Sequence, residues 1–529
     1  MWSLKKVREH WKQLMGLRKW RIRKLKLINA RLYFVSIFVG LLTGLIAVPY
    51  HYLLQFLFSI RKDFFVSSPQ WYEHVALFIG LWGILLLVAQ LVKKMPIISG
   101  GGIPQTRGVI SGRITYQHPF KELWAKFAGG LMALSAGLSL GREGPSVQIG
   151  SYVGTLVAKW TNILPGERKQ LLSAGAGAGL SAAFAAPLAS SLLVIESIER
   201  FDAPKTAITT LLAGVVAGGI AGWIFPISSY AQIQAVAPDF PFWISMKFFL
   251  FLALAVSVFG KFYSILTDLF QKWNQHIRIS TSIRMLYLSG IAYLISLFEI
   301  NLTGGGEAFL LQQFVRPDSQ IVWAGGFLLV HLLFTQFSFT SGLPGGNFIP
   351  TLVTGGLFGL LFALVLIHYQ VISKEHISYF MLLGMGAFLV AVVRTPLTAI
   401  VLITEITGHL EVFYPSIIVG GLTYYFTEML QIKPANVVLY NHLIRAPFLQ
   451  KQQRYHLYVE IMDGSYFDGK AVDTLTLPNR CEIKSIQRDR KALSPQGETL
   501  IPGDQVEIEM DVQDIEKLYE PLVSMANIY

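Results

Sequence analysis

A charged pair lies in the middle of a strongly apolar region, in the segment Gly141-Arg142-Glu143-Gly144-Pro145. A charged side chain at membrane depth is costly, so an ionisable residue there indicates a functional site. The glycine and proline residues around the pair break a helix, and a broken helix at that depth must line a cavity or be buried in protein. Backbone amides at the start of the next helix attract anions. The segment therefore predicts an anion pathway with a carboxylate inside it.

Three motifs of this region recur in the same order about 204 to 209 residues later. Corresponding helix breaks in two repeats predict a binding site where the two halves of a transporter meet. The matched motifs are Gly100-Gly101-Gly102 with Gly304-Gly305-Gly306, Gly141 to Pro145 with Gly346-Asn347-Phe348-Ile349-Pro350, and Pro187-Leu188 plus Glu196 with Pro396-Leu397 plus Glu405.

The elements that must position these motifs are membrane helices. The chain has 529 residues, of which 53% are hydrophobic and only 14% charged, whereas soluble domains carry about 25% charged residues. Apolar runs follow one another between Leu32 and Ile432, and each approaches the roughly 20 residues that a membrane-spanning helix needs. The sequence therefore predicts an all-α polytopic membrane protein. Its long basic N-terminus and full-length first span are unlike a cleavable signal peptide.

The net charge of +12 comes largely from basic residues directly before the first span. Such residues favour the cytoplasmic side and contact with anionic lipid, which explains the charge better than nucleic-acid binding does. Apolar residues at helical spacing within residues 1–30 also predict an amphipathic helix lying on the inner leaflet. They are Leu4, Val7, Trp11, Leu14 and Leu17.

The last part of the chain, residues 446–529, has the alternating pattern of a small soluble α+β domain. Predicted strands run over 455–462, 482–488 and 505–511, with turns at Asp463-Gly464 and Pro502-Gly503-Asp504. A closing helix is predicted over 514–522, with Asp514 as its cap. The lone cysteine, Cys481, excludes an internal disulfide and provides no metal signature.

Three of these motifs resemble the anion-site signatures of the CLC chloride channel and transporter family. They are Gly100 to Pro104, Gly141 to Pro145 and Gly346 to Pro350, and Lys126 also matches a family lysine. The resemblance covers about residues 31–445. It implies a homodimer in a bilayer with one pore per subunit. Each pore is built from an inverted repeat of tilted, broken helices, with halves at about 31–225 and 240–432.

The resemblance also implies which groups contact the anion. Chloride needs partial rather than full countercharge, because its binding must be tight enough to admit the ion and weak enough to release it. The backbone amides of Asn347 and Phe348 are the expected donors, and Gly101, Gly102 and Ile103 form the first motif of the site. Tyr440 matches the family tyrosine whose neutral hydroxyl meets the central ion. A tyrosine at the membrane interface is the alternative explanation for Tyr440.

Glu143 has the most specific expected role. Its carboxylate can occupy an anion site when ionised and leave it when protonated, which would link the anion pathway to protons. Arg142 and Lys126 are expected to support the site electrostatically. A purely structural ion pair between Glu143 and Arg142 is the alternative.

Two positions depart from the family pattern. Gly101 stands where the family usually has serine, so the backbone amides, or Ser99 in a shifted register, must replace a hydroxyl donor. This leaves open the preference between chloride and nitrate. Ser197 stands where coupled exchangers usually carry an inner glutamate. Water or the flanking Glu199 would then deliver protons, while Glu196 aligns with a more general family glutamate. Exchange of chloride for protons is expected, and an uncoupled chloride channel is the alternative.

The tail resembles the C-terminal regulatory module of potassium-uptake regulators, called the TrkA-C or RCK-C domain. The residues that carry this resemblance are Asp468-Gly469-Lys470, Ile486 to Arg490, Ser494-Pro495 and Ile501 to Asp504. It implies a cytoplasmic domain that dimerises. Some such modules bind cyclic di-AMP, so a sensor and a ligand-free dimerisation module are both open.

Two other classes of protein fit the sequence less well. The tail alone would suggest a cation transporter, but the chain has no Thr-Val-Gly-Tyr-Gly filter and no cluster of intramembrane acids. A membrane enzyme is disfavoured because His51, His118 and His442 are scattered and have no metal-ligand spacing. Chloride and protons are the expected substrates, in a bacterial plasma membrane with both termini in the cytoplasm. No catalytic residue, metal or cofactor is expected, apart from possible regulation by cyclic di-AMP.

Overall fold

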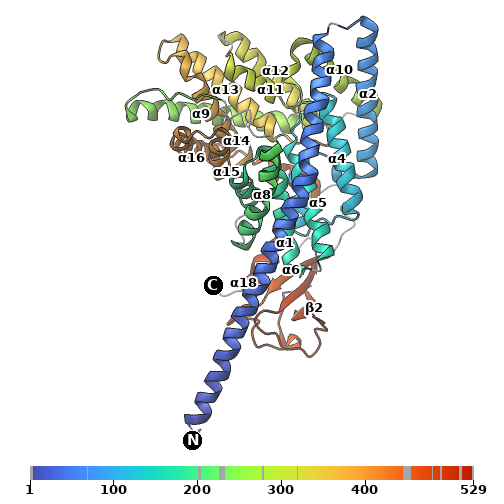
Figure 1. Cartoon of the computed structure of the whole chain (residues 1–529), viewed down its shortest axis with the longest axis vertical. Helices are drawn as coiled ribbons and strands as arrows, with labels where there is room; N and C mark the ends of the chain where they lie inside the picture. The colour runs from blue at the N-terminus through green and yellow to red at the C-terminus, as the bar shows by residue number, and fades with distance from the viewer. Residues whose placement is uncertain are drawn as a thin grey trace.

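The computed structural model describes residues 4–67, 69–161, 163, 165–199, 204–224, 233–276, 279–317, 320–444, 454–478, 481–488, 491–511 and 515–526. Helices make up the chain as far as Ile444, and a small sheet domain begins at Arg454 (Figure 1). The predicted domain boundary near residue 446 lies outside the described residues.

The helices of the first half surround the first set of motifs. They are α1 (Leu4–Val66), α2 (Trp71–Lys94), α3 (Ile103–Ile110), α4 (Pro119–Ser135), α5 (Glu143–Trp160), α6 (Pro165–Phe184), α7 (Pro187–Leu193), the π-helix η2 (Val194–Glu199) and α8 (Pro204–Ile224).

The second half repeats this pattern around the second set. Its helices are α9 (Phe242–His276), α10 (Thr281–Glu299), α11 (Glu307–Val315), α12 (Ile321–Thr340), α13 (Phe348–His368), α14 (Ile377–Val393), α15 (Pro396–Thr407), α16 (Phe413–Met429) and α17 (Ala435–Ile444). In the part of the chain that the structure describes, eight helices are long and apolar enough to cross a membrane. The prediction of a multi-pass membrane protein is confirmed.

The N-terminal region differs from the prediction of a separate surface helix. α1 is one helix of 63 residues, and it extends past the sheet domain at its N-terminal end (Figure 1). The physical reason is that the chain has no proline between Leu4 and Pro49, so no residue forces a bend where the apolar span begins. The side chains before residue 30 lie outside the described residues, and with them the predicted amphipathic face.

Close glycine contacts join equivalent helix pairs in the two halves. A Cβ atom on Gly355 of α13 would lie 2.6 Å from the carbonyl oxygen of Gly384 of α14. A Cβ atom on Gly150 of α5 would likewise lie against the backbone carbonyl group of Gly175 of α6. Small residues allow helix backbones to approach closely in membrane proteins. The α5–α6 and α13–α14 pairs therefore pack alike, as two copies of one unit would.

Two carboxylates connect the halves reciprocally. Glu196 accepts hydrogen bonds from the amides of Leu397 (3.0 Å) and Thr398 (2.8 Å), at the start of α15. Glu405 on α15 accepts hydrogen bonds from the amides of Leu188 (3.1 Å) and Ala189 (2.8 Å), at the start of α7. Each carboxylate accepts hydrogen bonds from amides that have no acceptor within their own helix. Its negative charge also complements the positive end of that helix.

The C-terminal domain contains an antiparallel sheet in the order β1-β4-β2-β3. Its strands are β1 (Arg454–Glu460), β2 (Glu482–Arg488), β3 (Lys491–Leu493) and β4 (Gln505–Asp511), and the helix α18 (Ile515–Ala526) follows. The three predicted strands and the closing helix are confirmed. β3 was not predicted, because three residues are too few to show an alternating pattern. Asp514, the predicted cap, lies outside the described residues.

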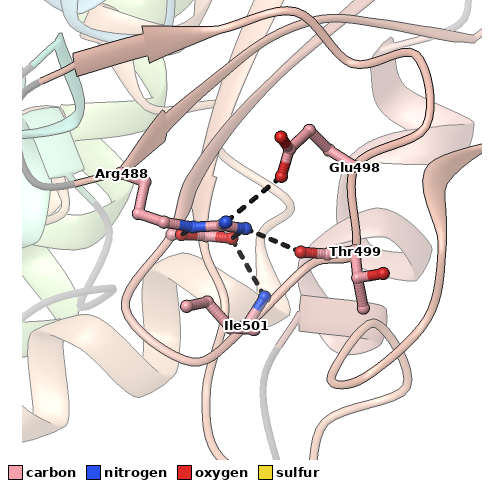
Figure 2. A network of polar contacts seen from close by, with 5 residues as sticks. Arg488, Glu498, Thr499 and Ile501 are labelled. Carbon is pink, nitrogen blue, oxygen red and sulfur yellow. Dashed lines mark hydrogen bonds and ion pairs between the residues drawn. The ribbon is translucent and has the colours of Figure 1, made fainter.

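Arg488 at the end of β2 organises the turn before β4 (Figure 2). Its Nε and Nη2 atoms each donate to one carboxylate oxygen of Asp504 at 2.9 Å, and Nη1 donates to Glu498 at 3.1 Å. Nη2 also donates to the carbonyl oxygen of Thr499, and the Ile501 amide donates to Asp504. Hydrogen bonding to Asp504 raises the pKa of Arg488, so this side chain keeps its charge.

Arg488→Gln is expected to loosen the C-terminal domain. Without the guanidinium, the Asp504 carboxylate, whose side chain is only 1% exposed, would remain buried without its countercharge. Breaking a buried ion pair costs about 3–5 kcal/mol. Because Arg488 itself is partly exposed, we expect a loss of about 1–3 kcal/mol. Thermal unfolding and limited proteolysis of the full-length protein measure the effect, with exposed Lys491→Gln as the control. Equal protease resistance of both variants would contradict the prediction.

Candidate anion site where two broken helices meet

The two helix breaks of the repeated motif lie directly against each other. The amide of Gly141 donates to the carbonyl oxygen of Gly346 at 2.6 Å, and the amide of Gly346 donates back to Gly141 at 2.8 Å. α5 begins two residues after Gly141, and α13 begins two residues after Gly346. The amide-rich starts of two helices from different halves of the chain therefore lie side by side.

The first glycine motif completes this junction. The amide of Gly345 donates to the carbonyl oxygen of Gly100 at 3.1 Å, and a Cβ atom on Gly101 would lie 3.4 Å from the Cα atom of Gly346. Gly102 has a φ angle of 91° and immediately precedes α3. This left-handed conformation favours glycine. Three helix starts, those of α3, α5 and α13, therefore come together, as the sequence predicted.

The carboxylate of Glu143 lies at the start of α13. Glu143 is completely buried, and its Oε2 atom accepts a hydrogen bond from the amide of Ile349 at 3.4 Å. Its Oε1 atom has no hydrogen-bond partner among the described residues. The carboxylate thus occupies a position where backbone amides favour negative charge. Sequence reasoning missed Ile349, because an amide donor leaves no mark in the side-chain pattern.

The two predicted amide donors precede Ile349. Asn347 is the N-cap residue of α13, and Phe348 is its first helical residue. Both side chains are buried, and the Phe348 ring lies 5.8 Å from the ring of Phe184 between the ring centroids. Apolar packing around the helix start lowers the local dielectric constant, which strengthens the attraction between its amides and an anion.

Lys126 supports the first motif from α4. Its side chain is fully buried, and Nζ donates to the carbonyl oxygens of Ile98 (2.8 Å) and Gly100 (2.7 Å). The ammonium group satisfies two carbonyls of the loop that turns into α3. Lys126 thus lies next to the junction, and its electrostatic supporting role stays a prediction.

Arg142 forms an ion pair with Glu307, the first residue of α11, at 3.3 Å between Nη2 and Oε2. The sequence had left a pair with the neighbouring Glu143 as the alternative. Glu307 is a site residue that sequence reasoning did not single out, although it directly follows the second glycine triplet. Through this contact the Gly304 to Gly306 motif is joined to the helix break at Gly141.

Tyr440 is buried, unlike a tyrosine exposed at a membrane interface. Its hydroxyl lies 3.1 Å from Oγ of Ser111, the C-cap residue at the opposite end of α3 from Gly102. The guanidinium groups of Arg107 and Arg113 lie 4.8 and 5.8 Å from the centroid of its ring. Contact between Tyr440 and the anion stays a prediction.

Another residue of α17 reaches Ser197. Asn436 is buried, and its Nδ2 atom donates to the Ser197 hydroxyl at 2.8 Å. Ser197 lies in the π-helix η2, and π-helical turns are frequent at functional sites. Sequence reasoning missed Asn436. The available signal was an amide side chain just after Pro434, at the start of a short apolar helix.

Glu199, at the end of η2, is buried and pairs with a cation near the surface. Its Oε2 atom lies 2.9 Å from Nζ of Lys169, and the side chains are 2% and 35% exposed respectively. The hydroxyl of Ser173 also donates to Glu199. Three residues were considered for an inner proton route. Among them, Glu199 has a carboxylate that contacts the partly exposed side chain of Lys169. Glu196 caps α15, and Ser197 binds Asn436.

Comparison with known proteins matches both parts of the chain. A family model described as voltage gated chloride channel matches residues 83–428, and a TrkA-C domain model matches residues 456–523. The H(+)/Cl(−) exchange transporter ClcA of Vibrio cholerae is 30% identical over 441 residues, covering 79% of this chain and 91% of that protein. ClcA of Salmonella schwarzengrund is 31% identical over 410 residues, covering 73% and 83%.

Solved structures share the arrangement of the helices. The crystal structure of a slow cyanobacterial Cl−/H+ antiporter has a TM-score of 0.72 and 27% identity, covering 79% of this chain and 99% of that one. A CLC-type fluoride/proton antiporter has a TM-score of 0.61 and 19% identity, covering 76% and 96%. At that lower identity the similarity concerns the fold alone.

Proposed function

Because the chain belongs to the voltage-gated chloride channel family and ends in a TrkA-C domain, we propose that it exchanges chloride for protons across a membrane. Both resemblances predicted from the sequence are confirmed by these matches. The exchange activity named for its relatives supports the proposal. The observation that carries it is the buried carboxylate of Glu143 on the amide end of α13.

Chloride and the ionised Glu143 compete for the same donors in this mechanism. The amides of Asn347 and Phe348 hold the anion, and the motif Gly101-Gly102-Ile103 forms the facing wall. When Glu143 takes up a proton, its carboxyl loses the negative charge that α13 attracts, so it can leave and admit chloride. Deprotonation returns the carboxylate to the amides and expels the ion. One group thus responds to both substrates.

We propose that protons reach Glu143 from the opposite side by way of Glu199. Serine does not titrate in the physiological range, so Ser197 cannot carry the proton itself. The pair of Glu199 with Lys169 offers a buried carboxylate beside a partly exposed cation. Water would bridge the remaining distance past Ser197 and Asn436. Glu196 serves the fold as a helix cap.

The proposal includes the assembly and its orientation. The protein is a homodimer with one pore per subunit, in a bacterial plasma membrane. The basic residues before the first span support a cytoplasmic N-terminus. The N-terminal end of α1 and the sheet domain lie at the same end of the molecule (Figure 1), and Glu460 of β1 lies 3.6 Å from Lys205 of α8. Transport of this kind needs no catalytic residue and no cofactor.

Ion flux from proteoliposomes tests the proposal directly. Purified protein in vesicles with a chloride gradient and no proton gradient should release chloride and move protons in the opposite direction. Potassium flux should equal that of empty vesicles. Chloride release without proton movement would replace exchange by the uncoupled channel, and potassium-selective flux would overturn anion transport altogether.

We also propose that the TrkA-C domain binds cyclic di-AMP, which would connect chloride movement to the osmotic state of the cell. Titration calorimetry on the detergent-solubilised full-length protein should then show saturable heat with cyclic di-AMP and none with AMP. The flux of the protein in vesicles should change over the same concentration range. No heat at high ligand concentration would leave the domain as a dimerisation module.

A further inference from the structure

The second glycine triplet packs against the junction where α5 and α13 begin. Gly304, Gly305 and Gly306 have φ angles of 65°, 90° and 78°, a left-handed run that non-glycine residues rarely adopt. A Cβ atom on Gly305 would lie 3.1 Å from the carbonyl oxygen of Leu140 and 3.2 Å from the side chain of Ile349. Leu140 precedes Gly141, and the Ile349 amide binds Glu143. The triplet therefore fixes the start of α11 beside both helix breaks.

A buried cation fixes the same loop from another helix. Arg61 of α1 is 5% exposed. One of its nitrogens donates to the carbonyl oxygen of Ser135 at 3.1 Å, and another donates to the hydroxyl of Thr303, directly before the triplet. Contacts with α1 thus hold Thr303, at the start of the connection that leads through the triplet to Glu307.

The ion pair between Arg142 and Glu307 is partly exposed, although Arg142 directly precedes the buried Glu143. The side chains of Arg142 and Glu307 are 18% and 21% exposed, whereas Glu143 is completely buried. Arg142 is covalently adjacent to Glu143. α11, which begins at Glu307, lies at the end of the molecule away from the sheet domain (Figure 1).

We propose that Glu307 is a positioning residue for anion passage at the face away from the sheet domain: it holds Arg142 beside the entrance and neutralises much of its charge. An unneutralised guanidinium next to the pathway would hold chloride too long, because charge at the rim of a pore retains counter-ions. With Glu307 in place, chloride is attracted and still released. This inference rests on the proposed function, since it concerns entry to the Glu143 site.

Glu307→Gln should change the response to chloride on one face only. We expect the chloride concentration for half-maximal transport from that face to fall about threefold to tenfold, since removal of one nearby charge is worth about 1 kcal/mol at this exposure. Maximal turnover should fall with it. The chloride concentration for half-maximal transport from the face that carries the sheet domain should stay unchanged. Proteoliposomes measure both faces once protease access to the sheet domain has established the orientation.

Matched variants separate positioning from general damage. Glu299→Gln removes a carboxylate from the same connection, where it binds Asn301 rather than Arg142, and should behave like the parent protein. Arg142→Gln should weaken chloride binding at the same face. Adding Glu307→Gln to Arg142→Gln should have a smaller effect than in the parent protein, because the carboxylate would no longer have the charge of Arg142 to neutralise. Glu307→Asp keeps the charge and should restore part of the parent behaviour.

Equal effects of Glu307→Gln on both faces, or no effect on either, would overturn the inference. If that variant is not recovered folded, an additive effect of Glu307→Asp and Arg142→Gln would overturn it instead. The proposed function fails by a different result, namely chloride movement without proton movement in the parent protein. The two failures are therefore distinguishable.

Discussion

Glu143→Gln is expected to abolish proton movement while chloride movement continues. A glutamine side chain has nearly the shape of the protonated glutamic acid but can neither release nor take up a proton. Counter-movement of protons should therefore fall at least about tenfold, because the variant lacks the group that is proposed to respond to both substrates. Simultaneous chloride and proton recordings from proteoliposomes measure the ratio of the two fluxes.

The pH dependence should change in the same variant. In the parent protein, acidification protonates Glu143 and removes the carboxylate that competes with chloride, so chloride movement should rise as the pH falls. In Glu143→Gln the neutral amide is present at every pH, and chloride movement should be nearly flat. Glu411 is exposed, so Glu411→Gln is the control. It should keep the proton coupling and the pH dependence of the parent protein. A proton-to-chloride ratio unchanged in Glu143→Gln would remove this residue from the mechanism.

Gly144→Ala is expected to cause the second large loss. A Cβ atom at Gly144 would come within 2.8 Å of the carbonyl carbon of Gly101 and 3.0 Å of its Cα atom. These are backbone atoms of another element, so they cannot rotate away as a flexible side chain does. The start of α5 and the first glycine motif must separate, and the convergence of three helix starts is lost. Overpacking of this kind costs about 1–3 kcal/mol.

Chloride movement through Gly144→Ala should fall at least about tenfold, because small displacements of positioning groups have large effects on rate. Flux measured per folded protein, with folding judged by gel filtration, separates transport from yield. Gly290→Ala is the matched control, since a Cβ atom on that glycine of α10 meets nothing within 4 Å. Full transport by a well-folded Gly144→Ala protein would show that the contact with Gly101 is dispensable.

The sequence predicted which motifs come together better than which contacts their residues make. Glu143, Lys126 and the amides of Asn347 and Phe348 were recognised from motifs, and the structure places Glu143 and Lys126 at the junction. Ile349 was missed because it acts through its backbone. The sequence left open an ion pair between Arg142 and the adjacent Glu143. In the structure Arg142 pairs with Glu307, which is 165 positions away.

The sequence by itself determined where helices break, where the chain repeats and where the strands of the tail lie. Glycine and proline act on the backbone at their own positions, and alternating apolar residues specify a strand within a few residues. Tertiary structure alone decided which groups meet across the break: Gly141 with Gly346, Glu307 with Arg142, and Asn436 with Ser197. Such partners are set by the packing of helices from opposite halves, and no local preference of either residue encodes the choice.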